Sequence, residues 1–251
     1  GVSVSVGVAL SINEIRNSVR ARIDQSTVTA GGALSLLANE TATIRAMSIG
    51  GAVSVGAGTT GVAVAGEGAA SRNLIENTVA ATISNAPGTA GNAGVRAATT
   101  LLKATDGAGV SATSGGISGA VGAGTTGVAG AIGVGLSLNE VRNTVTAAID
   151  AAQVDTGAHA LTLEARSTST IQALSASGQL GVGAGQVGVG IAVAASYGKN
   201  EIHNGIAARI GAGSVVRASS VSLTASDDAR IASTGGALGV TVGAGYVGVG
   251  V

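Results

Sequence analysis

The chain has 251 residues, with 13 basic and 13 acidic residues, 43 glycines, and no cysteine, phenylalanine or tryptophan. Balanced charge gives no overall field that would attract nucleic acid or an anionic membrane, and the lack of cysteine excludes a disulfide framework. Glycine at this density disfavours helices, there is no strict Gly-X-Y period, and the apolar runs are too rich in glycine for a membrane helix. We therefore expect an all-β protein with a thin core of Val, Ile, Leu and Ala, without membrane insertion.

A Gly-Val pair marks the start of each of four repeats of about 60 residues. The repeats are 1–60, 61–126, 127–187 and 188–247, with the start of a fifth at 248–251, and together they predict one continuous segment. Because the chain begins and stops at the same phase of the repeat, we expect it to be part of a longer array.

Twelve residues after each Gly-Val pair comes the motif N-x-[IVL]-x-N-x-[VI]-x-A-x-I, first at Asn13–Ile23. Its period of two predicts a strand with the asparagines on the inward, apolar face and Glu14 and Arg16 outward. Buried amides need partners, which stacked copies can supply. The predicted asparagine ladder comprises Asn17, Asn77, Asn143 and Asn204, with Asn13, Asn73, Asn139 and Asn200. Ligand binding by these amides is the alternative.

All variation in length falls after this strand, between its last isoleucine and a recurring alanine, where the four repeats differ by up to six residues. The longest version contains Ala86-Pro87-Gly88 and Gly91-Asn92, which are typical of turns. We expect an exposed loop here. The remaining alternation predicts five or six short strands per repeat in a parallel β-solenoid, or β-helix. Three coils per repeat are favoured over two longer ones.

The last third of each repeat has no charge, and glycine and alanine occupy one of its two faces. The candidate packing face comprises Gly56, Gly58, Gly61, Gly122, Gly124, Gly127, Gly183, Gly185, Gly188, Gly243, Gly245 and Gly248. We expect this face to lie against another protein surface, as in lateral packing of filaments, or against a second sheet of the same chain. The alternative is that glycine only eases tight corners.

No constellation of catalytic or metal-binding residues emerges. The Gly-x-Gly triplets open no helix, so a phosphate loop is not supported. His159 and His203 are isolated in the sequence from any Cys or carboxylate cluster, which predicts no metal site. Glu140 and Glu201 recur outward beside Arg142 and His203, which is typical of a solvated face. We expect no enzyme, no catalytic residue and no cofactor.

The run "GVAVA…N.I.N.V.A.I…S.V.AGG.L.L.A…A.I.A" resembles the repeats of giant secreted filamentous adhesins of Gram-negative bacteria, including haemagglutinin-like and leukotoxin-family adhesins. The clearest stretches are Val62–Ile83, Gly1–Ala38 and Gly188–Ala225. The resemblance implies an extracellular β-helical shaft at the bacterial cell surface, acting in adhesion, aggregation or biofilm. It also implies self-association of filaments, and a receptor or glycan bound through regions outside this sequence.

Two alternatives remain to this interpretation. One is a self-assembling sheath or fibre that packs through the glycine/alanine face. The other is a carbohydrate- or receptor-binding module, against which the near absence of aromatic residues argues, since the chain has only two tyrosines.

Overall fold

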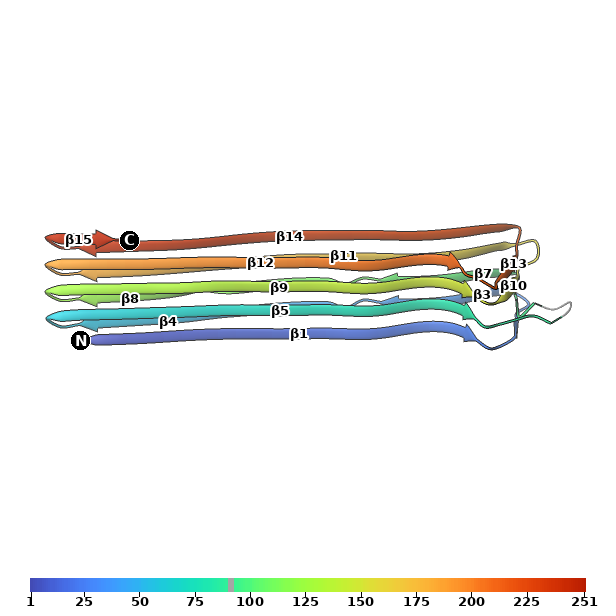
Figure 1. Ribbon diagram of the computed structural model, residues 1–251, viewed down its shortest axis with the longest axis horizontal. Coiled ribbons are helices and arrows are strands. Elements are labelled where there is room, and N and C mark those ends of the chain that lie inside the picture. Colours follow the sequence, from blue (N-terminus) through green and yellow to red (C-terminus); the bar gives the residue numbers. More distant parts are fainter. Residues whose placement is uncertain (90–92) are drawn as a thin grey trace.

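The computed structural model describes residues 1–89 and 93–251, and two long sheets dominate it (Figure 1). The front sheet consists of β1 (Val2–Asp24), β5 (Thr60–Ser84), β9 (Thr126–Asp150), β12 (Val187–Ile210) and β15 (Val247–Gly250), in that order. The back sheet consists of β3 (Ala33–Glu40), β4 (Thr43–Ala57), β7 (Thr99–Asp106), β8 (Gly109–Ala123), β11 (Ala160–Ala184) and β14 (Ser220–Ala244). A short end sheet of β2 (Val28–Thr29), β6 (Val95–Arg96), β10 (Gln153–Asp155) and β13 (Val215–Arg217) closes one end.

All strand pairing is between parallel strands of successive repeats, which confirms the predicted all-β parallel solenoid. Each repeat runs out along the front sheet, crosses the end sheet, and returns along the back sheet to a tight turn (Figure 1). In the parts of the chain that the structure describes, there is no helix long and apolar enough to cross a membrane.

Each repeat forms one coil, so the predictions of three coils or two were wrong. Asn13 pairs with Asn73 of the next strand, which pairs in turn with Asn139 and then with Asn200. One repeat therefore advances the stack by a single strand spacing of about 4.8 Å, where three coils would advance it about 14 Å.

The strands are also longer than the five or six short ones expected in each repeat. Between Thr60 and Ser84 every second side chain points inward without a break, and no proline interrupts the ladder of hydrogen bonds. A strand of this length extends about 80 Å. The molecule is consequently a thin slab, long in the strand direction and only a few coils high.

The core of the slab tapers from the end sheet to the tight turns. At the wide end the inward side chains are large, as with Ile83, Leu102 and Leu161, which are fully buried. At the narrow end they are small, as with Ala63, Gly56 and Ser54. A Cβ on Gly56 would stand 2.1 Å from the carbonyl oxygen of Val62, so the two sheets approach almost backbone to backbone.

The variable segment forms the wide end, where Gln25, Asn85 and Ala151 take the same left-handed conformation (φ 48°) at the corner that leaves the front sheet. Pro87 is exposed there, as expected of a loop. The predicted turn at Gly91-Asn92 lies outside the described residues. At the opposite end, Gly58 adopts a φ of 144° in the tight turn, a region that favours glycine.

Candidate functional site

The first asparagine of each motif forms a continuous ladder of side-chain amides through the core. Asn13 Nδ2 donates to Asn73 Oδ1 at 2.8 Å, Asn73 Nδ2 to Asn139 Oδ1 at 2.7 Å, and Asn139 Nδ2 to Asn200 Oδ1 at 2.7 Å. Asn73 and Asn139, in the two inner coils, are buried. Each amide thus supplies the partner that its neighbour needs, as the sequence predicted.

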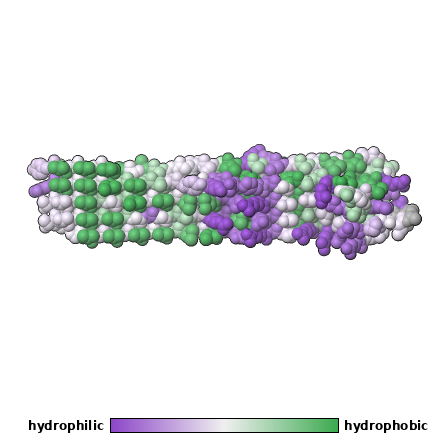
Figure 2. Space-filling view, in the orientation of Figure 1, coloured by the Kyte–Doolittle hydropathy of each residue, from purple (hydrophilic) through white to green (hydrophobic). Residues whose placement is uncertain are grey.

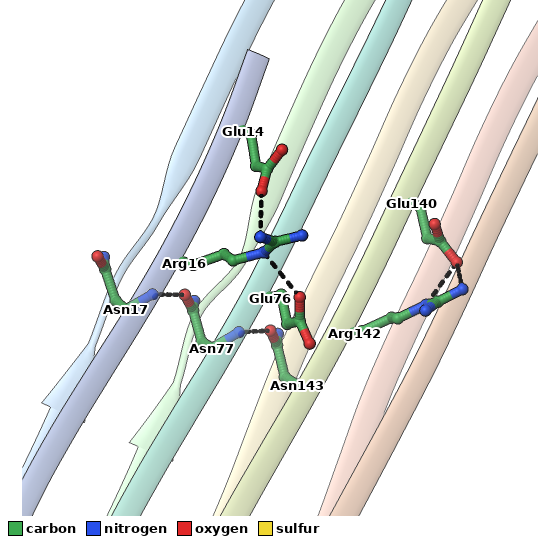
Figure 3. Close-up of polar contacts among 8 residues, drawn as sticks. All are labelled: Glu14, Arg16, Asn17, Glu76, Asn77, Glu140, Arg142 and Asn143. Atoms are coloured by element: carbon green, nitrogen blue, oxygen red, sulfur yellow. Dashed lines mark hydrogen bonds and ion pairs between the residues drawn. The ribbon is translucent and has the colours of Figure 1, made fainter.

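The second asparagine of each motif makes different hydrogen bonds from the predicted ones, because its side-chain amide does not bond to the side-chain amide of the next repeat. The backbone N–H of Asn17 donates to Asn77 Oδ1 (3.3 Å), and that of Asn77 donates to Asn143 Oδ1 (3.1 Å), so the three residues lie side by side on successive strands in Figure 3. Asn204 Oδ1 is buried without a hydrogen-bond partner, so this series stops before the fourth coil.

The Nδ2 groups of this second series cross the core to an acidic column on the back sheet. Glu40 and Asp106 share one register position, which continues through Ser167 to Asp227. The cross-core bonds are Asn17 to Glu40 Oε1 (2.8 Å), Asn77 to Asp106 Oδ1 (3.1 Å), Asn143 to Asp106 Oδ2 (2.5 Å) and Asn204 to Asp227 Oδ1 (3.0 Å). These bonds fix the register of one sheet against the other.

Asp106 is the most buried carboxylate of the acidic column. Burial raises the pKa of its carboxyl group, the hydrogen bond from Asn77 opposes that shift, and the nearby Glu40 adds to it. Sequence reasoning missed this column, although Glu40, Asp106 and Asp227 do recur two residues after the alanine that marks each repeat.

A second buried carboxyl group lies in the narrower part of the core. Glu67 Oε1 accepts a hydrogen bond from Gln179 Nε2 at 3.1 Å, whereas its Oε2 has no partner. Glycines make room for it, since a Cβ on Gly50 or Gly116 would lie 2.8 or 2.4 Å from Oε2. Burial raises the pKa of Glu67. Neither Glu67 nor Gln179 was predicted, because neither recurs in the other repeats.

Charged residues on the outer face of the front sheet form ion pairs between and within coils (Figure 3). Arg16 contacts Glu14 at 2.8 Å and Glu76 at 2.9 Å, and Arg142 pairs with Glu140. Exposed pairs of this kind contribute about 0–1 kcal/mol each. They agree with the expected solvated face.

The fold brings His203 beside two carboxylates, although the sequence indicated no such cluster. Ligand atoms of Glu140, Glu201 and His203 lie within 4.8 Å of one another. Both carboxylates are already paired, Glu140 with Arg142 and Glu201 with Lys199 at 3.0 Å. The hydrogen bond from Lys199 lowers the pKa of Glu201. We assign no metal to this cluster.

Most of the glycine/alanine face lies inside the slab, against the second sheet of the same chain, whereas Gly58, Gly124, Gly185 and Gly245 lie in the tight turns, as the alternative of glycine at corners expects. A Cβ added to any of the back-sheet glycines Gly56, Gly122 and Gly183 would meet a backbone carbonyl of the strand across the core. The same holds for Gly61 of the front sheet. Of the two partners that the sequence left open, the chain's own second sheet is the one found. The valines and isoleucines between these glycines point outward instead.

Comparison with known proteins found no family model, no curated protein and no solved structure that matches this chain. The class of the protein is defined by its fold, a parallel β-solenoid with one long coil per repeat and polar ladders in the core. The resemblance to filamentous adhesins stays a prediction.

Proposed function

We propose that this chain is a structural segment of an extracellular filament or giant bacterial surface protein, without catalysis. The observation that carries the proposal is the in-register stacking of every repeat on the next. It joins all four coils through the amide ladder from Asn13 to Asn200. Such a stack can be extended by further coils with the same contacts, which is what a filament requires.

The interior chemistry supports a structural role. The recurring polar groups include the asparagines, the acidic column and inward serines, and the asparagines bond to the acidic column across the core. A ligand at the asparagines would have to replace these bonds inside a closed core, where an unmade hydrogen bond costs about 1–3 kcal/mol. We therefore favour the ladder over the alternative of ligand binding.

The dimensions of the coil favour a sheath as the second candidate. A repeat of about 60 residues advances the stack by only about 4.8 Å but covers about 80 Å in width. Each added repeat therefore increases the height of the stack only slightly, while it adds a strip as wide as the whole slab. This geometry supports a self-assembling sheath as the alternative function.

Labelling of intact cells tests the proposal. Antibodies raised against the purified chain should bind non-permeabilised cells of the source bacterium, and immunogold should mark filaments or a surface layer in electron micrographs. An antibody to a cytoplasmic enzyme is the control and should label only permeabilised cells. Labelling by both antibodies only after permeabilisation would contradict an extracellular role.

A further inference from the structure

Both outer faces of the narrow end are apolar and free of charge. The front apolar face includes Val4, Val8, Val64, Ile132, Val134 and Val193, and the back apolar face includes Ile49, Val53, Ile117, Leu174, Leu180 and Leu238. In Figure 2 the hydrophobic side chains of the front sheet gather over one end of the slab, bordered by a hydrophilic belt near its middle. Val8 is 79% exposed and Ile117 is 73% exposed.

The chain cannot bury these side chains in its own core. Inward positions at this end hold only small residues because the sheets lie too close for large side chains. Gly122 has no room even for a Cβ, which would lie 2.2 Å from the carbonyl oxygen of Val128. Only contact with another molecule can therefore bury these large aliphatic side chains.

Each face is large enough for a stable contact. Ten residues of strand span about 34 Å and four coils about 19 Å, giving about 650 Å² a face. Two such faces in contact would bury about 1,300 Å², within the range of specific interfaces of about 1,200–2,000 Å². A typical monomer exposes a largest apolar patch of about 300–600 Å².

The two faces differ in shape, and this difference selects the occupant. The back face is hollowed by a groove of about 570 Å³, lined by Ile49, Ile117, Leu174 and Leu238 with small residues between them. Three of these small residues belong to one register column, in which Gly115, Ala176 and Gly236 follow Ile49.

The front face, by contrast, carries rows of projecting aliphatic side chains. Val6, Ile132 and Val193 belong to one register column of this face, and all three are exposed.

We propose that the groove of the back apolar face receives the front apolar face of a second copy of this chain. The contact joins unlike faces, so it leaves one of each face free and continues into a layered stack. The uncharged zones overlie one another, and the charged belt of the front sheet stays at the rim in water. This inference rests on the proposed structural role, but it is tested on the purified chain. Failure to stack would leave surface labelling of cells unaffected.

Two variants of the full chain test the contact. Ile132→Lys places a charge on the front face and Ile117→Lys places one on the back face, both at exposed positions where folding does not require the apolar side chain. Ser18→Lys and Ser222→Lys are matched controls, because both residues are exposed and lie toward the wide end. Circular dichroism checks that all four variants fold, and sedimentation velocity gives their masses.

The wild type and both controls should form species whose mass rises with concentration. Each face variant alone should sediment as a monomer of 23.4 kDa, and an equimolar mixture should give a dimer of twice that mass, because each variant supplies one intact face. Dimers of either variant alone would overturn the proposal in favour of like-with-like pairing. A wild type that stays monomeric would overturn it too, whether or not it floats with phosphatidylcholine vesicles. Flotation would assign the faces to lipid.

Discussion

Replacing Asn77 with leucine tests whether the cross-core bonds hold the two sheets in register. The side chain of Asn77 is buried, its Oδ1 accepts from the backbone N–H of Asn17, and its Nδ2 donates to Asp106. Asn77→Leu removes both bonds and leaves the Asp106 carboxyl group with fewer donors. A neutral hydrogen bond contributes about 1 kcal/mol and one to a charged group about 1.5–3 kcal/mol.

Burial of the leucine side chain offsets part of that loss, by about 1.5 kcal/mol or more. We therefore expect the free energy of unfolding to fall by about 1–3 kcal/mol at pH 7. The cost should be smaller at a pH low enough to protonate Asp106 in both the folded and unfolded chain, because the bond is then no longer to a charge.

Denaturant unfolding followed by circular dichroism measures the effect. Thr78→Leu is the matched control, since it changes the next residue of the same strand on the outer face, and we expect a change within about 0.5 kcal/mol. In a double-mutant cycle with Asp106→Asn, the two sites should couple by at least about 0.5 kcal/mol. Equal costs for Asn77→Leu and Thr78→Leu, or purely additive effects in the cycle, would refute the reasoning.

Three further changes follow from the core and the surface. Glu67→Gln should stabilise the chain at pH 7 and flatten its pH dependence. Because burial raises the pKa of Glu67 in the folded chain, the free energy of unfolding is highest below the unfolded-state pKa, near 4.3, and it falls as the pH rises through the folded-state pKa. A wild-type thermal midpoint that stays unchanged across this pH range would contradict the prediction. Gly122→Ala should destabilise by about 1–3 kcal/mol through overlap with Val128, whereas Gly130→Ala, with nothing within 4 Å of its Cβ, should be neutral or stabilising. Equal midpoints for the two alanine variants would argue against contact between the sheets. Arg16→Ala should cost less than about 1 kcal/mol, and a larger loss in denaturant unfolding would show that the exposed ion pairs hold the coils together.

The asparagine strand was the part of the fold that the sequence predicted best. Period-two alternation placed Asn73, Ile75 and Asn77 inward, and all three are buried. The repetition of the motif also implied stacking of one copy on another. These inferences succeeded because alternation and repetition are local properties that a sequence displays directly.

The number of coils was not predictable from the same signals. The alternation was interpreted as five or six short strands per repeat, yet β5 continues unbroken from Thr60 to Ser84. Where the two sheets lie too close for side chains, glycine occupies the inward positions and valine the outward ones. The sequence does not show the distance between the sheets, so this inverted pattern was not recognised as part of one long strand.

The acidic column was missed for a related reason. Asp106 and Asn77 are 29 residues apart and belong to different strands, so only the fold brings them together. Glu67 and Gln179 are 112 residues apart and belong to different coils. The repeat pattern supplies the register within each sheet, but pairing across the core also requires the alignment of one sheet against the other, which the repeat pattern does not give.

The central claim, one coil per repeat, is tested most directly by a distance between equivalent positions of the first and fourth repeats. Ser18 is related to Gly205 by three register steps, through Thr78 and Thr144. The chain has no cysteine, so spin labels at Ser18→Cys and Gly205→Cys would be the only two. One coil per repeat predicts backbones about 14 Å apart, with strong dipolar broadening in the electron paramagnetic resonance spectrum. A separation of about 29 or 43 Å, as two or three coils per repeat would give, would contradict the account.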